Sequence, residues 1–191
     1  MAYQRLNSEC VRVSREGEYA TVFIREWSRA PEAVGFGGEL VIHSSFGTMG
    51  YTWTHVARPF KEFLSDISQE SLVGKLFGEA AMVYDGDASY KAVAEHLESL
   101  KQKGDIAEDV MQELQAVWAC LEEVILFSEG GFWHAIGELD SSPDEVTLDL
   151  SEEGSWLLKK RQNDQATGLM EVLWPEIRAS LLGVDEVASV E

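Results

Sequence analysis

The sequence predicts an α+β protein in which an N-terminal antiparallel β-meander of about four strands is covered by a C-terminal helical bundle. Residues 10–56 hold short runs of alternating apolar and polar residues joined by glycine-containing turns, which is typical of β-strands. After Pro59 the apolar residues recur at helical spacing. The net charge changes at the same point, from −1 over residues 1–57 to −18 over residues 58–191.

These changes divide the chain into an antiparallel sheet portion, 1–57, and an acidic helical portion, 58–191. We expect the two portions to pack as one compact unit. A chain of 191 residues with 45% apolar residues can bury a core without a disulfide or a metal. Cys10 and Cys120 are too few for a disulfide scaffold.

No targeting signal is visible in the sequence. No run approaches the roughly 18 apolar residues of a membrane span, and residues 1–19 lack the apolar stretch of a signal peptide. We therefore expect a protein of the cytoplasm that has no membrane partner.

Glycine, proline and β-branched residues predict the N-terminal elements. These are a hairpin, a loop and two further strands: 10–27, 28–38, 39–45 and 50–55. Strand alternation places Leu40 and Ile42 on one face of the third strand. In the fourth strand it places Tyr51, Trp53 and His55 on a common face.

Apolar periodicity and capping residues predict the helices. The expected helices are 60–67, 72–77, 89–103, 105–125, a short helix at 155–161 and a last helix from residue 163 or 164. Ser89 is the expected cap of the third helix, and Asp105 with Glu108 matches a capping box for the fourth. Pro175 is expected to kink the last helix.

The sequence does not predict a metal or cofactor site. A metal needs clustered ligands, and the histidines are scattered singly, without a Cys-x-x-Cys or His-Glu-x-x-His motif: His43, His55, His96 and His134. We therefore expect no cofactor.

One alternative function is a small hydrolase or ligand-binding protein that uses the hairpin of residues 39–55. Ser44 with His43 or His55 nearby is the only arrangement that suggests a nucleophile and its base. The Gly-x-Ser-x-Gly elbow of many hydrolases is missing. We favour a non-enzymatic protein without catalytic residues.

The acidic charge gives the main functional prediction. A net charge of −19 opposes direct nucleic-acid binding, which needs Lys and Arg on phosphates, and favours association with basic surfaces. If the acidic residues converge, they form a phosphate-mimicking surface. The predicted partner-binding residues are Glu108, Asp109, Glu113, Glu123, Glu129, Asp140, Asp144, Glu145, Asp149, Glu152 and Glu153.

Four short segments of the sequence resemble a group of uncharacterised bacteriophage and prophage proteins. They are GELVIHSSFG followed by YTW, then PFKEFL, and near the end QATGLMEVLWP. The resemblance implies phage origin and action in the bacterial host cytoplasm, and it carries over no catalytic residue. Small acidic phage accessory proteins are often counter-defence factors, anti-CRISPR proteins among them, and this step is analogy.

The leading hypothesis is therefore a phage-encoded, anti-CRISPR-like inhibitor of a host defence system. It acts by binding the Lys/Arg-rich, nucleic-acid-binding surface of a host protein or complex. A third alternative is a phage accessory protein that forms a homo-oligomer through the aromatic patch at Phe132 and Trp133.

Overall fold

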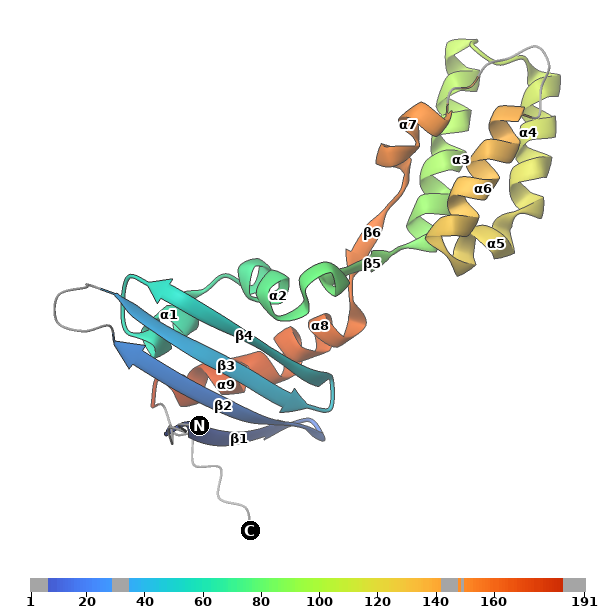
Figure 1. Ribbon diagram of the computed structural model, residues 1–191. Helices are drawn as coiled ribbons and strands as arrows, with labels where there is room; N and C mark the ends of the chain where they lie inside the picture. Colours follow the sequence, from blue (N-terminus) through green and yellow to red (C-terminus); the bar gives the residue numbers. More distant parts are fainter. Residues whose placement is uncertain (1–6, 29–34, 142–147, 149, 184–191) are drawn as a thin grey trace, which may run out of the picture. The chain divides into compact units, whose positions relative to one another are not determined.

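The computed structural model describes residues 7–28, 35–141, 148 and 150–183. A four-stranded antiparallel sheet precedes a mostly helical region (Figure 1). The strands pair in sequence order, as in a meander. They are β1 Glu9–Arg15, β2 Glu18–Ser28, β3 Phe36–Ser44 and β4 Gly47–Val56. The predicted α+β class is confirmed.

Two tight turns connect the hairpins of the sheet. Between β1 and β2, Glu16 has φ 55° and Gly17 has φ 86°, and hairpin turns commonly need such left-handed residues. Between β3 and β4, Gly47 has φ 115°, a conformation that glycine adopts without steric cost. The Ser44 hydroxyl closes this second turn, because it donates to the Gly47 carbonyl and accepts from the Phe46 amide.

Strand β4 carries a bulge near its end. Val56 pairs with Phe36 and Trp53 pairs with Gly38, so two residues of β4 lie opposite one residue of β3. The extra residue shifts the alternation of side chains between the two faces. As a result Trp53 and Val56 are both buried, whereas His55 is exposed. The prediction that His55 shares a face with Trp53 is wrong for this reason.

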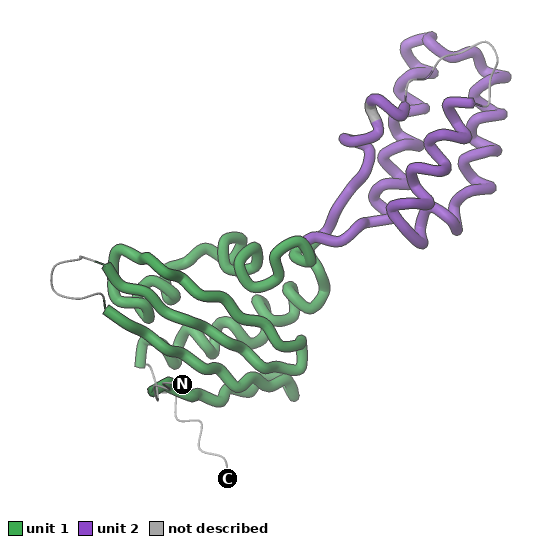
Figure 2. Tube along the Cα trace, viewed as in Figure 1, with its two compact units in different colours: residues 1–81, 162–191 green, residues 82–161 purple. Residues whose placement is uncertain are grey.

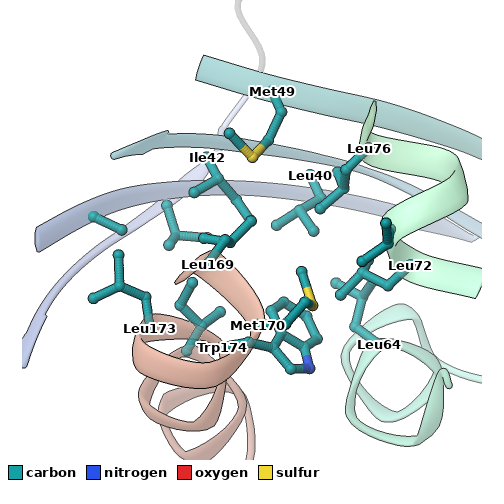
Figure 3. Packing of buried hydrophobic residues seen from close by; sticks show 14 of the residues in the cluster. Leu40, Ile42, Met49, Leu64, Leu72, Leu76, Leu169, Met170, Leu173 and Trp174 are labelled. Atoms are coloured by element: carbon teal, nitrogen blue, oxygen red, sulfur yellow. The ribbon is translucent and has the colours of Figure 1, made fainter. Parts of the chain in front are cut away.

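Helices cover one face of the sheet (Figure 1). They are α1 Phe60–Asp66, α2 Gln69–Phe77, the 3-10 turn η1 Gly78–Ala81, α8 Asp164–Gly168, the π-helical segment η2 Leu169–Leu173 and α9 Trp174–Leu181. Figure 3 shows Leu40 and Ile42 of the sheet packed with Leu72 of α2 and with Leu169 and Leu173 of the C-terminal segment. Full burial of each such side chain stabilises the fold by about 1.5–3 kcal/mol.

The C-terminal segment changes its helical geometry ahead of Pro175. A proline inside a helix has no N–H for the bond to the preceding turn. Here α9 begins at Trp174, so that Pro175 lies in its first turn. The wider π-helical segment η2 precedes this junction, as expected where the hydrogen-bond ladder is interrupted. The predicted kink takes the form of a junction between two helical geometries.

The chain divides into two compact units (Figure 2). Residues 1–81 and 162–191 form the sheet unit, and residues 82–161 form the helical unit. Strands give way to helices between Val56 and Phe60, close to the division predicted at residues 57 and 58. The compact units follow a different division, because the apolar residues of the C-terminal segment belong to the core of the sheet unit and the helical unit has a separate core.

Helices α3, α4 and α6 of the helical unit pack side by side (Figure 1). The elements of this unit are β5 Met82–Tyr84, α3 Gly86–Lys103, α4 Glu108–Cys120, α5 Glu122–Phe127, α6 Glu129–Ser141, α7 Leu150–Leu157 and β6 Lys160–Gln162. The largest fully buried side chains of its core are Leu97, Met111, Leu114, Ile125, Phe132, Ile136 and Leu139.

The N-terminal caps of α3 and α4 differ from the prediction. Asp85, and not Ser89, caps α3, because its carboxylate accepts from an amide of the first turn at 3.0 Å. Asp105 does not cap α4, which begins at Glu108 without a side-chain cap. The Glu108 carboxylate instead lies 2.9 Å from the Lys101 ammonium.

The helix predicted over residues 105–125 is two helices. Helix α4 ends at Cys120 and α5 begins at Glu122, with Leu121 between them at φ −97°. The short helix predicted over residues 155–161 is displaced, because α7 starts and ends earlier and the chain continues into β6. The apolar spacing continues across the break at Leu121 between α4 and α5, so the sequence pattern does not reveal that break.

Candidate functional site

Two neighbouring residues of the β3–β4 hairpin, His43 and Ser44, face opposite sides of the sheet. Adjacent side chains of a strand alternate between faces, and here the His43 ring is exposed while Ser44 is buried. The His43 ring shares a hydrogen bond with the Thr48 hydroxyl, with 2.7 Å between Nδ1 and Oγ1. The Ser44 hydroxyl is used in the turn, where its Oγ lies 3.1 Å from the Gly47 carbonyl oxygen.

The third candidate of this hairpin, His55, lies at its other end. Thr48 pairs with His43 across the hairpin, and His55 follows Thr48 by seven residues on β4. A strand rises ~3.3 Å per residue, so about 23 Å separate His55 from the His43 pair. A nucleophile needs its base within hydrogen-bond reach. The fold does not bring the three residues together.

All eleven predicted partner-binding residues belong to the helical unit. Three lie on α4, one on α5, two on α6 and one on α7: Glu108, Asp109, Glu113, Glu123, Glu129, Asp140 and Glu152, respectively. Asp144, Glu145, Asp149 and the side chain of Glu153 lie outside the described residues. Helix α4 contacts α5 and α6, and α6 contacts α7, so the seven described carboxylates are carried by neighbouring helices.

The segment that carries these residues has neither lysine nor arginine. Between Lys103 and Lys159 the sequence holds fourteen Asp and Glu residues and no Lys or Arg. The helical unit as a whole has eighteen acids and six bases, a net charge of −12, whereas the sheet unit has a net charge of −7. The acidic charge is therefore concentrated in the helical unit.

Three of the predicted carboxylates stabilise the fold locally. Glu108 pairs with Lys101, and this hydrogen bond lowers the pKa of the Glu108 carboxyl and raises the pKa of the Lys101 ammonium. Glu129 lies 3.6 Å from the Lys160 ammonium. Asp140 accepts from two amides at the start of α7, each at 2.9 Å. These three carboxylates are engaged within the chain.

In the helical unit, five exposed glutamates form no ion pair with another described residue. They are Glu113 on α4, Glu122 and Glu123 on α5, Glu138 on α6 and Glu152 on α7. We call them the unpaired carboxylates. Glu122 was absent from the predicted site because a continuous helix would place it at the edge of the apolar stripe, and the break at Leu121 turns it outward. Glu138 was also absent, although it is exposed on α6.

The aromatic patch proposed for oligomerisation is mostly part of the core. Phe132 is fully buried, and its ring meets that of Trp133 edge-on at 5.3 Å. Trp133 is 38% exposed. A Cβ atom at Gly154 would lie 2.6 Å from the Trp133 ring, so glycine is needed there for α7 to approach α6. Only part of the Trp133 ring remains on the surface.

The described residues form neither a grouped metal site nor a membrane-spanning helix. Within residues 7–28, 35–141, 148 and 150–183, no three His, Cys, Asp or Glu side chains are grouped as a metal site. None of the helices that the structure describes is both long enough and apolar enough to cross a bilayer.

Comparisons with known proteins identify the family. A search of curated proteins and a search of solved structures each returned no match. A family model described as a phage family, Phage_phiTE_072, matches residues 3–167. The match includes the four strands and the whole helical unit and ends at α8. The chain therefore belongs to this phage protein family.

Proposed function

We propose that the protein is a phage-encoded inhibitor of a host defence complex, of the anti-CRISPR kind, that acts by binding and without catalysis. In this proposal the helical unit presents its carboxylates to a Lys/Arg-rich surface of the complex that otherwise binds nucleic acid. The observation that carries the proposal is the segment between Lys103 and Lys159, with fourteen acids and no base. Membership of a phage family supports it.

The charge pattern suits a competitor of nucleic acid. Surfaces that bind DNA or RNA neutralise phosphates with Lys and Arg, and a unit of net charge −12 is attracted to the same side chains. Asp109 and Glu113 are one turn apart on α4, about 6 Å along the axis, which is close to the spacing of successive phosphates on one strand. Long-range attraction raises the association rate and makes it sensitive to salt.

Neutralising the five unpaired carboxylates tests the proposal. The variant E113Q/E122Q/E123Q/E138Q/E152Q keeps the side-chain shapes and removes five charges. Wild type and variant are produced in bacterial strains that each carry one defence system, CRISPR–Cas types included, and phage plating is measured. We expect wild type to raise plating in one of these strains and the variant to lose most of that effect. Wild type that raises plating in none of them overturns the proposal.

The matched control is a variant that neutralises five exposed glutamates of the sheet unit, E26Q/E62Q/E70Q/E79Q/E171Q. We expect this control to inhibit like wild type, and equal loss in both variants would exclude a site on the helical unit. H43A/H55A should also inhibit like wild type, whereas its inactivation with an intact fold would support the hydrolase alternative. Binding of wild type to the purified complex should weaken steeply with salt, and an unchanged affinity at high ionic strength contradicts the proposal.

A further inference from the structure

Three apolar side chains are exposed along α5, among the acidic residues of the helical unit. Val124 and Leu126 are partly exposed, and Phe127 is 90% exposed, which makes it the most exposed large apolar side chain in the described part of the chain. Phe127 is the last residue of α5. A phenylalanine ring left in water loses the stabilisation that burial provides, so this exposure has a cost for the free protein.

The backbone before Phe127 is held in place by close contacts with α3 and β5. A Cβ atom at Gly86 would lie 2.8 Å from Leu126 Cα, so the glycine lets α5 lie directly against the start of α3. The Tyr84 hydroxyl donates to the Ile125 carbonyl at 2.9 Å. Burial raises the pKa of this hydroxyl, so it remains a donor through the neutral range.

The backbone after Phe127 is fixed by the start of α6. The Gly131 amide donates to the Ser128 hydroxyl at 3.0 Å, which is the pattern of an N-terminal cap. A Cβ atom at Gly131 would lie 2.0 Å from the Val124 carbonyl oxygen, so α5 and α6 meet at a distance that only glycine permits. Phe127 is therefore presented by a rigid corner, and little ordering is needed before it binds.

Acidic residues lie close to Phe127 along the chain. Glu123 precedes Phe127 by four residues in α5, so the two are surface neighbours, with about 5–6 Å between their Cβ atoms. Glu129 begins α6 two residues after Phe127, and its carboxylate also lies 3.6 Å from the Lys160 ammonium. A planar aromatic group flanked by negative charges resembles an unstacked nucleobase flanked by its phosphates.

The same charges argue against two other occupants. A second copy that docked its Phe127 at this corner would place the same carboxylates opposite each other, and like charges in contact cost several kcal/mol. Anionic lipid surfaces attract basic segments, whereas this corner is acidic. Proteins that bind single-stranded nucleic acid offer the complementary chemistry, since they stack bases on aromatic side chains inside a basic groove.

We propose that Phe127 is a nucleobase mimic that stacks in the base-binding pocket of a single-stranded nucleic-acid groove on the partner. Glu123 and the other unpaired carboxylates meet the Lys and Arg side chains that otherwise hold the phosphates. Val124 and Leu126 extend the apolar contact next to the ring. This proposal rests on the proposed function and names the part of the surface that enters the groove.

Substitutions of Phe127 separate stacking from simple apolar contact. The probe is the purified effector complex from the strain in which the chain raises plating, loaded with a fluorescein-labelled single-stranded oligonucleotide. Displacement by wild type, F127W, F127L and F127S is followed by anisotropy. Stacking of one base is worth about 1–3 kcal/mol, so F127S should need roughly 5-fold to 150-fold more protein. F127W should act like wild type, and the amount of F127L needed should fall between the amounts of wild type and of F127S. F127L equal to wild type overturns the mimicry.

Further measurements distinguish failure of this inference from failure of the proposed function. If F127S displaces like wild type while E113Q/E122Q/E123Q/E138Q/E152Q does not displace, the carboxylates bind and the ring is not an anchor. If every variant displaces like wild type, both proposals fail. L182S, at an exposed apolar residue of the sheet unit, is the matched control and should act like wild type. Two results would show that the Phe127 ring is already covered, and each would overturn the inference. One is a wild type that self-associates while F127S is monomeric. The other is altered amide exchange in free F127S.

Discussion

The hydroxyl of Ser89 joins the two ends of the helical unit. Its Oγ accepts from the Lys159 amide at 2.8 Å, next to β6, and donates to the Asp85 carbonyl at 2.6 Å, at the start of α3. The residue has no exposed surface. The expected role of helix cap was wrong because only the return of Lys159, seventy residues later, determines what this hydroxyl contacts.

Ser89→Ala is expected to lower the local stability of the helical unit by about 1–3 kcal/mol, because it removes the hydrogen-bond partner of the partly buried Lys159 amide. Amide hydrogen exchange along α3 and at Lys159 measures the effect. Ser99→Ala, on the same helix and without a recorded side-chain hydrogen bond among the described residues, is the control and should have little effect. Equal protection in Ser89→Ala and wild type would contradict this role.

At the scale of elements, the corner between α5 and α6 depends on a close approach of two backbones. Gly131 is buried, and its Cα faces the Val124 carbonyl. No helix was predicted between residues 125 and 155, whereas the structure has a helix of 13 residues there, Glu129–Ser141. Glycine is unfavourable within a helix, and here tertiary contact requires it.

Gly131→Ala should destabilise the helical unit by about 1–3 kcal/mol or more, because the added methyl group overlaps the Val124 carbonyl and the corner must shift. Gly137→Ala in the same helix is the matched control, since no heavy atom lies within 4 Å of a Cβ added at Gly137. This control should stabilise the unit by about 0.5–1 kcal/mol. Denaturant unfolding followed by hydrogen exchange compares the two variants. A neutral Gly131→Ala would mean that the corner is not tightly packed.

At the scale of the whole molecule, the sheet unit and the helical unit each have an apolar core of their own. The sheet unit draws its core from both ends of the chain, and the helical unit is formed by one continuous segment inserted between them. The inserted segment carries most of the net negative charge. The proposed binding surface therefore belongs to a unit whose core is complete without the sheet.

Core truncations should act on one unit at a time. Leu169 and Leu97 are buried in the two different cores, and a Leu→Ala change in a core costs about 2–5 kcal/mol. Leu169→Ala is expected to lower hydrogen-exchange protection in β2 and β3 and leave α4 and α6 unchanged, and Leu97→Ala should do the reverse. Loss of protection in both units from either change would show that they unfold together.

Local patterns predicted the elements whose signals lie within a few residues. The hairpin of β1 and β2, the helices α1 and α2 and the end of α3 at Gly104 all follow turn residues and apolar spacing, and Gly104 has the expected positive φ of 80°. Errors occurred where a contact outside the local sequence pattern decides the position of a side chain. Glu108 pairs with Lys101 instead of closing a capping box, and His55 is turned outward by a bulge that depends on pairing with β3.

By itself the sequence determined the α+β class, the strand order of the meander and the acidic character of the region that follows. Tertiary structure alone decided that the C-terminal apolar stripe packs on the sheet, that five exposed glutamates of the helical unit have no ion pair with another described residue, and that Phe127 is exposed at a rigid corner. The reason is that periodicity records which face of an element is apolar, whereas the partner that covers that face depends on residues far away in the chain.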